Sequence, residues 1–293
     1  MDKMQAVPMA IEKKAMAKIN LALDVIRKRE DGYHEVKMIM QTVDLFDTLS
    51  FQKSEVSGIH IITNIPEIPT DKRNLIYKAA DMLMQQYSIA EGVNISLVKR
   101  IPVAAGMAGG STDAAATLKG INELFELKIP EEKLRELGVK IGADVPYCIM
   151  GGTALSEGIG EILTKLPNVP AGHLVIAKPN VNVSTKMVYE NLNADRLKDH
   201  PDVDGMIEAI MRQDISKIAE RMGNVLETVT QVRYPIIKEL KDIMLNEGAA
   251  SALMSGSGPT VFGLFFSKEM AENAYEIIKT KNLVKQLFVT TFI

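Results

Sequence analysis

The sequence has no tryptophan and a single cysteine, Cys148. A lone cysteine excludes an intrachain disulfide and is typical of a protein from the reducing cytoplasm. The net charge of −3 does not favour nucleic-acid or membrane-surface binding, because both need a basic surface. No apolar run approaches the roughly 18 residues of a membrane span. The first twenty residues are interrupted by charged residues and therefore do not resemble a signal peptide. We therefore predict a cytoplasmic protein without nucleic-acid or membrane partners.

Length and composition are those of an ordinary globular protein. The 293 residues, of which 46% are hydrophobic, suffice for two domains. Strand and helix patterns are mixed along the chain, and the Pro- and Gly-containing segment 167–172 indicates a linker. We predict an α+β fold with two domains, residues 1–168 and 169–293. The early methionines Met4 and Met9 leave the start open, and we expect residues 1–9 to be a loose leader.

Residue periodicity predicts the following elements. Strands are expected near 16–26, 36–51, 56–63, 92–100, 152–156, 159–166, 173–177, 249–254, 260–266 and 287–291. Helices are expected near 74–88, 111–126 and 130–140, from residue 268 onward, and at several places between the strands at 173–177 and 249–254.

The most informative stretch is Pro102–Ala116, which joins an alternating strand to an alanine-rich helix through small residues. Without bulky side chains, backbone N–H groups can approach an anion, and the positive end of the helix adds to the field. Ser111, Thr112 and Asp113 are expected to cap the helix start. The stretch predicts a phosphate cradle and thus a nucleotide; the alternative is a helix start rich in glycine for tight packing alone.

Two better-known phosphate motifs do not fit this stretch. A Walker A loop ends in Gly-Lys-Ser/Thr, but Gly110 runs directly into Ser111. A dinucleotide fingerprint needs Gly-x-Gly-x-x-Gly, and Ala108 breaks that spacing.

Two polar groups precede the cradle. Lys18 and Asn20 share one side of an apolar strand, where they need partners if they are buried and are ordinary surface residues if that side is exposed. The Asp-Gly turn before Tyr33 and His34 favours a hairpin. Tyr33 offers a stacking face and His34 a donor and an acceptor, which suits a base edge, although plain turn chemistry explains the same residues.

Two further segments follow the cradle. Asp144 lies between small residues in a loop, where it either braces a turn or acts as a base that takes a hydroxyl proton during phosphoryl transfer. Ser255–Thr260 is a second glycine-rich turn, which by itself is typical of hairpins.

Taken together, these segments resemble the GHMP kinase superfamily over residues 15–266. The matching motifs are Ala-Lys-Ile-Asn-Leu at 17–21, Arg-x-Asp-Gly-Tyr-His at 29–34, Asn-Leu-Ile at 74–76, Gly-Ala-Asp-Val-Pro at 142–146 and the loop at 255–260. The resemblance implies an N-terminal domain like domain 2 of ribosomal protein S5, a ferredoxin-like C-terminal domain and an active site in the cleft between them. The Asp-Gly-Tyr-His turn is similar to that of the branch which phosphorylates a cytidine-diphosphate-linked methylerythritol.

The resemblance also implies an activity: transfer of the γ-phosphoryl group of ATP, with Mg²⁺, to the 2-hydroxyl of that substrate in the non-mevalonate route to isoprenoids. Asp144 would be the general base. Lys18 would lie beside it, lower its pKa and stabilise charge on the attacking oxygen and the γ-phosphate.

Binding residues are implied in the same way. ATP would be held by Asn74, Lys99, Pro102, Ala104, Ala105, Gly106, Met107, Ala108, Gly109, Gly110, Ser111 and Thr112, with Asn74 and Lys99 bordering adenine and ribose. The substrate would be held by Asn20, Tyr33, His34, Asp144, Tyr189, Gly256 and Ser257, with Tyr189 stacking on the cytosine. Ser111 or Thr112 would help hold Mg²⁺, whose other ligands the sequence leaves open.

One departure from the family pattern stands out. Ala108 replaces a glycine of the cradle, which costs on the order of 1 kcal/mol if that position needs a positive φ. Alternatives to the predicted function are a kinase for another small alcohol such as homoserine or mevalonate, a silent nucleotide-binding paralogue, and an RNA-binding module suggested by the fold alone. The sequence does not decide between a monomer and a homodimer.

Overall fold

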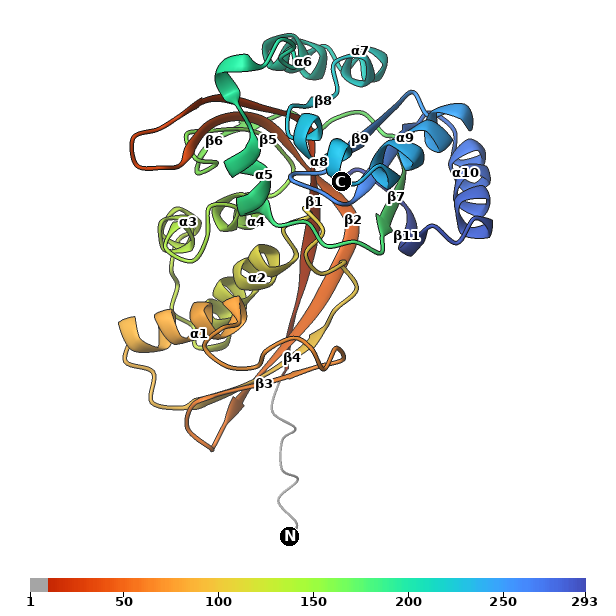
Figure 1. Cartoon of the computed structure of the whole chain (residues 1–293). Helices are drawn as coiled ribbons and strands as arrows, with labels where there is room; N and C mark the ends of the chain where they lie inside the picture. Colours follow the sequence, from red (N-terminus) through yellow and green to blue (C-terminus); the bar gives the residue numbers. More distant parts are fainter. Residues whose placement is uncertain (1–9) are drawn as a thin grey trace. The chain divides into compact units, whose positions relative to one another are not determined.

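The computed structural model describes residues 10–293, so the expected leader at 1–9 lies outside the described residues (Figure 1). Strands and helices are mixed along the chain, which confirms the α+β prediction. The elements are β1 (Ile11–Lys28), β2 (His34–Ser54), β3 (Ile59–Thr63), α1 (Leu75–Gln86), β4 (Gly92–Val98), α2 (Gly109–Leu124), α3 (Glu131–Val139), α4 (Val145–Met150), β5 (Thr153–Glu157), β6 (Ile162–Leu166), β7 (His173–Pro179), α5 (Thr185–Asn191), η1 (Ala194–Arg196), α6 (Val203–Met211), α7 (Ile215–Glu220), β8 (Gly223–Asn224), α8 (Glu227–Arg233), α9 (Ile236–Asn246), β9 (Ser251–Met254), β10 (Val261–Phe265), α10 (Lys268–Thr280) and β11 (Val284–Thr291).

Each strand and helix given a range from periodicity exists, and the expected linker at 167–172 carries no helix or strand. Two expectations are wrong. The segment after Asp144 is the short helix α4 rather than a loop, and α2 begins at Gly109, so Ser111, Thr112 and Asp113 lie inside the helix instead of capping it.

The chain divides into two compact units. Unit 1 comprises residues up to Ala15, Phe46–Ile101 and Gly110–Met150, and unit 2 comprises Met16–Leu45, Pro102–Gly109 and Gly151–Ile293. The long strands β1 and β2 each have residues in both units. The two units are therefore built from alternating segments of the chain and are not separated by one boundary in the sequence. The sequential domains 1–168 and 169–293 stay a prediction.

Unit 1 packs helices against a sheet. β4 pairs with the second half of β2 in antiparallel and with β3 in parallel fashion. Its core is formed by buried side chains of these strands and of α1 to α4. Gly120 lets α2 approach the sheet, because a Cβ there would lie 2.4 Å from the ring of Phe51. Close packing thus fixes α2, the helix that follows the predicted cradle.

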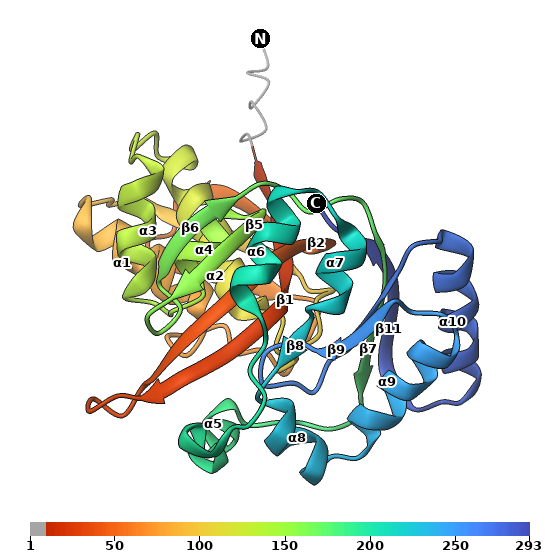
Figure 2. The same ribbon diagram turned by 90° about the horizontal axis from the view of Figure 1, so that it is seen from above.

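Unit 2 contains a four-stranded antiparallel sheet in the order β11-β7-β10-β9. Helices α9 and α10 pack on this sheet and on each other (Figures 1 and 2). Numbered along the chain, the strands lie in the order 4-1-3-2 with a helix in each crossover, which is the ferredoxin-like arrangement that the resemblance implies. In the same unit, β5 pairs with the first half of β2, β6 pairs with β5, and β8 pairs with β1.

Candidate active site

The predicted phosphate cradle begins with Pro102–Gly109, which we call the cradle loop and which lies in unit 2; its last residues, 110–112, belong to the first turn of α2. Three of its residues have positive φ: Ala104 at 51°, Gly106 at 71° and Ala108 at 56°. Two of these are alanines, whose Cβ makes the left-handed conformation cost about 1–2 kcal/mol. Position 108 therefore does need a positive φ, so replacing glycine by Ala108 strains the backbone of the loop.

Gly106 touches the second glycine-rich turn, Ser255–Thr260, in the same unit. A Cβ on Gly106 would lie 2.1 Å from the backbone oxygen of Ser255, so the position accepts glycine alone. The Ser255 hydroxyl donates to the Gly106 carbonyl at 2.9 Å. These contacts show that the turn buttresses the cradle loop, and the expected substrate contacts of Gly256 and Ser257 stay predictions.

Lys18 and Asn20 also adjoin the cradle loop within unit 2. The Lys18 backbone N–H donates to the Met107 carbonyl at 3.3 Å, and the Lys18 ammonium donates to Oδ1 of Asn20 at 2.6 Å. Both residues are buried, with exposures of 5% and 0%. The alternative of an exposed polar face is wrong, because β1 is buried on both faces here. The Lys18 backbone therefore contacts the cradle loop, and its ammonium is buried together with the Asn20 amide.

The Asp31–Gly32 turn joins β1 to β2 as a hairpin, as predicted. The Arg29 N–H donates to the Tyr33 carbonyl at 2.8 Å, and Oδ1 of Asp31 accepts the N–H of Tyr33. Tyr33 remains 61% exposed. The turn is thus fixed by its backbone and leaves the Tyr33 ring free for a ligand.

His34 lies beside Tyr189 of α5, with ring centroids 5.1 Å apart and planes tilted by 41°. Burial, and then the positive charge of Lys28, lowers the pKa of His34 below its usual value. The ring is therefore neutral at pH 7, with one donor and one acceptor nitrogen. The structure thus brings together in unit 2 two residues that the resemblance implies as substrate-binding.

Sequence reasoning missed Asn224, the last residue of β8. Its side-chain amide donates to the carbonyls of Met254 and Gly256 at 2.8 and 2.7 Å, and its Oδ1 accepts the N–H of Leu226. This one side chain holds the turn that buttresses Gly106. The local sequence Gly-Asn-Val-Leu at 223–226 carries no motif that would have marked this residue. Ser257 of the same turn shares a hydrogen bond with Thr185, the first residue of α5, at 2.7 Å.

In unit 1, Lys99 is not a free cation. Its ammonium donates to carboxylate oxygens of Asp47 and Asp113, both at 2.6 Å, and all three side chains are almost fully buried. Burial raises the pKa of Asp113 to about 8; Lys99 opposes this rise and Asp47 adds to it. The contact of Lys99 with adenine and ribose stays a prediction, and Asp47 is a further residue that sequence reasoning missed.

Asp144 directly precedes α4, and its carbonyl accepts the N–H of Cys148. A Cβ on Gly142 would lie 3.9 Å from Oγ of Ser111, so the loop that carries Asp144 lies near the first turn of α2. Asn74 caps α1: its Oδ1 accepts the N–H of Ile76, and its Nδ2 donates to the Pro69 carbonyl. The roles of Asp144 and Asn74 toward ligands stay predictions.

Among residues 10–293, no group of three or more His, Cys, Asp and Glu side chains could hold a metal ion. A Mg²⁺ ion in a phosphoryl-transfer site keeps several waters and takes oxygens from the substrate phosphates, so it does not need such a group. Ser111 is half-buried and Thr112 only 2% exposed, which favours the Ser111 hydroxyl as the accessible donor.

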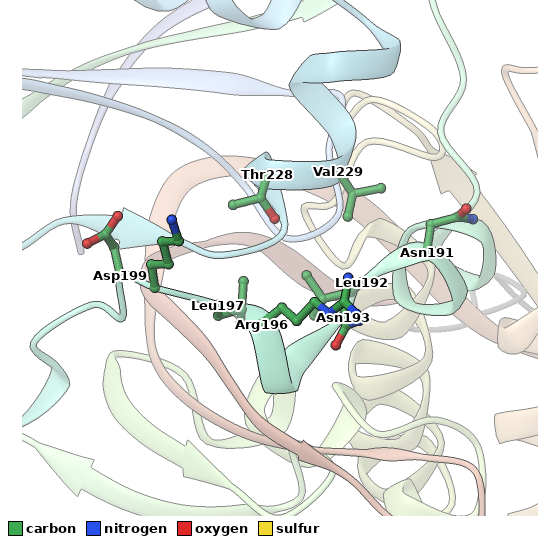
Figure 3. A pocket seen from close by; sticks show the side chains of 9 residues that line it. Asn191, Leu192, Asn193, Arg196, Leu197, Asp199, Thr228 and Val229 are labelled. Carbon is green, nitrogen blue, oxygen red and sulfur yellow. The ribbon is translucent and has the colours of Figure 1, made fainter.

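A pocket of about 390 Å³ lies between the segment from Asn191 to Asp199 and helix α8 in unit 2 (Figure 3). A second pocket, of about 480 Å³, lies on the sheet of unit 1 and is lined by residues such as His60 and Asn94. No residue predicted to bind ATP or substrate lines either pocket. In the described part of the chain, no helix is long and apolar enough to cross a membrane.

Comparisons with known proteins agree with this geometry. Residues 74–152 match the model of the GHMP kinases N terminal domain, and residues 206–284 match that of the GHMP kinases C terminal domain. The 4-diphosphocytidyl-2-C-methyl-D-erythritol kinase of Lachnospira eligens is 52% identical over 281 residues, 96% of this chain and 98% of the relative. The enzyme of that name from Lachnoclostridium phytofermentans is 53% identical over 282 residues, 96% of this chain and 97% of the relative.

Solved structures point the same way. A crystal structure of 4-(cytidine 5'-diphospho)-2C-methyl-D-erythritol kinase is 32% identical, with a TM-score of 0.83, and the match covers 96% of this chain and 99% of that one. Homoserine kinase from Cytophaga hutchinsonii shares the fold, with a TM-score of 0.78 at 22% identity over 100% of this chain and 98% of its own. The protein belongs to the GHMP kinase family.

Proposed function

We propose that the protein is an ATP-dependent kinase that phosphorylates the 2-hydroxyl of 4-diphosphocytidyl-2-C-methyl-D-erythritol, giving ADP and the 2-phosphate in the non-mevalonate route to isoprenoid precursors. The observation that carries the proposal is the pairing of His34 with Tyr189 at 5.1 Å. It supplies a base-reading and a stacking group in a chain whose relatives of about half identity bear this enzyme's name. The prediction of a kinase is confirmed by the family.

The cytosine is held between aromatic side chains. Tyr33 and Tyr189 stack on its faces, and the neutral His34 ring pairs with its polar edge. Asn20 contacts the methylerythritol hydroxyls. Gly256 and Ser257 meet the diphosphate, and the link of Ser257 to Thr185 supports this assignment because Thr185 begins the helix that carries Tyr189.

The ATP phosphates are held by backbone N–H groups of residues 106–112. Positive φ at three positions of the cradle loop and the start of α2 at its end support this assignment. Pro102, Ala104 and Ala105 shape the entry of the loop, and Asn74 borders adenine. Ser111, with substrate phosphates and water, would hold Mg²⁺, which would offset the charge of the phosphate oxygens.

Asp144 accepts the proton of the attacking 2-hydroxyl. Lys18 stabilises the negative charge on the attacking oxygen and the γ-phosphate. Its burial beside the cradle loop and its hydrogen bond to Asn20 support this role, because a buried ammonium with a fixed direction needs no reorganisation when charge develops. Positioning and charge stabilisation by these groups do most of the catalytic work.

The test is turnover. Purified protein is incubated with Mg-ATP and 4-diphosphocytidyl-2-C-methyl-D-erythritol, with mevalonate or homoserine in parallel, and new phosphomonoester is followed by phosphorus NMR. We expect signal from the first alcohol alone and a loss of roughly 10²–10⁴ in Asp144→Asn. Asp214→Asn is the matched control, since Asp214 also precedes a short helix and accepts the N–H of Lys217.

Each other result is decisive. Equal rates in Asp144→Asn and the wild type would remove Asp144 from its role but keep the kinase. Turnover of mevalonate or homoserine in preference would identify another alcohol kinase. A folded protein that binds ATP without phosphorylating any of the three alcohols would be the silent paralogue.

A further inference from the structure

Unit 1 buries three ionisable side chains that the reaction itself does not use. The side chains of Lys99, Asp47 and Asp113 are 4%, 0% and 6% exposed. The ammonium reaches Oδ2 of both aspartates at 2.6 Å. Removing charges from water costs several kcal/mol per ion, so such a cluster adds little net stability compared with an apolar core. Its placement in the chain therefore points to another purpose.

The first carboxylate fixes the chain just before the cradle loop. Oδ1 of Asp47 accepts the backbone N–H groups of Arg100 and Ile101 at 2.6 and 2.8 Å. These two residues directly precede Pro102. The Lys99 backbone N–H in turn donates to Oδ1 of Asn64 at 2.7 Å. The entry to the cradle loop is thus tied to β2 and to the end of β3.

The second carboxylate fixes the chain just after the cradle loop. Asp113 is the fifth residue of α2, which begins at Gly109. Its backbone carbonyl accepts the Thr117 hydroxyl at 2.8 Å. Because the Lys99 ammonium bonds to both aspartates, one cation ties the residues before the loop to the helix after it.

We propose that Lys99, with Asp47 and Asp113, is a positioning residue that clamps both ends of the cradle loop at the separation needed to hold the ATP phosphates. Lys99 acts through the loop and does not touch the nucleoside. The role rests on the proposed ATP-dependent function. Without the clamp, the ends of a loop strained at two alanines drift apart, and misplacement on the order of 1 Å costs about a hundredfold in such sites.

The test compares Lys99→Met with Lys119→Met, a substitution of a half-buried lysine of the same unit. The Lys119 ammonium donates to the Ile149 carbonyl, away from the loop ends. Dissociation constants for ATP and for inorganic tripolyphosphate are measured by titration calorimetry. We expect Lys99→Met to weaken both ligands by at least about tenfold and by the same factor, and Lys119→Met to change neither by more than about twofold. A loss confined to ATP would mean direct contact with the nucleoside and would overturn the proposal, as would equal behaviour of the two variants.

Hydrogen exchange measured without nucleotide tests the clamp independently of the proposed ATP-dependent function. We expect the amides of Arg100 and Ile101 to exchange faster in Lys99→Met than in the wild type, and unchanged exchange would contradict the clamp. If Lys99→Met does not fold, Asp113→Asn replaces it, since the new amide oxygen still accepts from the ammonium; a smaller but matched loss for both ligands is then expected. Faster exchange in a protein whose wild type binds neither ligand would remove the proposed function and leave the clamp a purely structural device.

Discussion

The hydroxyl of Ser255 donates to the carbonyl of Gly106 at 2.9 Å, and the Ser255 carbonyl lies where a Cβ of Gly106 would be. Two glycine-rich segments about 150 residues apart in sequence are thereby pressed together backbone to backbone. The conformation of the cradle loop therefore depends on contact with the turn at Ser255–Thr260 as well as on the loop's own sequence.

Gly106→Ala should therefore disable nucleotide binding. The added methyl group would meet a backbone oxygen at 2.1 Å and cannot be accommodated by a side-chain movement. Displacing the loop by on the order of 1 Å should lower kcat/KM for ATP by roughly a hundredfold. Steady-state kinetics at varied ATP and saturating alcohol measure this loss.

Gly58→Ala is the control for this substitution. Gly58 also has a positive φ, 100°, but nothing lies within 4 Å of its Cβ position. It should cost stability through backbone strain and leave kcat/KM for ATP within about twofold. If both variants lose activity alike, strain alone explains the effect and the contact with Ser255 is unimportant.

Ala108→Gly should stabilise the protein. At φ 56° the alanine pays about 1–2 kcal/mol of left-handed strain, whereas glycine pays about 0.5–1 kcal/mol of extra chain entropy on folding. The balance is a gain of about 0.5 kcal/mol in the free energy of unfolding, measured by urea denaturation. Ala105→Gly, in the same loop but without a positive φ and only 3% exposed, should lose about 1 kcal/mol. A loss at Ala108 equal to that at Ala105 would contradict the strain.

The sequence predicts a large part of this structure because most elements obey one period. β4 and α2 carry clear two- and 3.6-residue patterns, and their bounds differ from expectation by only a few residues. The helix α4 is missed because six residues are too few to show a period and follow a loop-like Gly-Ala-Asp. The order of the predicted elements along the chain also does not show that β1 and β2 each contribute residues to both compact units.

The site is predictable where a motif is local and not where partners meet from afar. The Asp31–Gly32 turn and the cradle loop are recognisable because each is one continuous segment. Burial of Lys18 is not, because it depends on what covers both faces of β1. Asp47 and Asn224 are missed for the same reason, because each hydrogen-bonds to backbone groups more than 25 residues away in the sequence. Asp47 bonds to the backbone of residue 101, and Asn224 bonds to the backbone of residue 254.

Asp113 should give the protein a distinctive dependence on pH. Its pKa is about 8 in the folded protein, mainly through burial, against 3.8 for an ordinary aspartate. Between about pH 4 and pH 8 the folded state keeps a proton on Asp113 that the unfolded state has already released. The stability that this group contributes is therefore complete below about pH 4 and is lost as the pH rises through about 8. Urea unfolding at pH 5, 7 and 9 should show Asp113→Asn gaining stability relative to wild type at each step. A constant difference between the two proteins would mean that Asp113 is ionised throughout.

Asn224→Asp should loosen the turn that buttresses the cradle loop. The amide nitrogen of Asn224 donates to the carbonyls of Met254 and Gly256 at 2.8 and 2.7 Å. A carboxylate oxygen in its place would face two carbonyl oxygens with no proton to share, in a site only 7% exposed. We expect a loss of about 3 kcal/mol in the free energy of unfolding and a raised KM for ATP.

Asn191→Asp is the matched control, because Asn191 is exposed and donates one hydrogen bond, to the Met187 carbonyl. It should change the free energy of unfolding by no more than about 0.5 kcal/mol. The diagnostic result for Asn224→Asp is recovery at low pH. Burial beside two carbonyl oxygens raises the pKa of the new carboxyl, so the stability deficit should shrink as the pH falls through that raised pKa towards about pH 4, where protonation has restored one donor. A deficit that does not depend on pH would mean that the hydrogen bonds to the carbonyls of Met254 and Gly256 are not what Asn224 supplies.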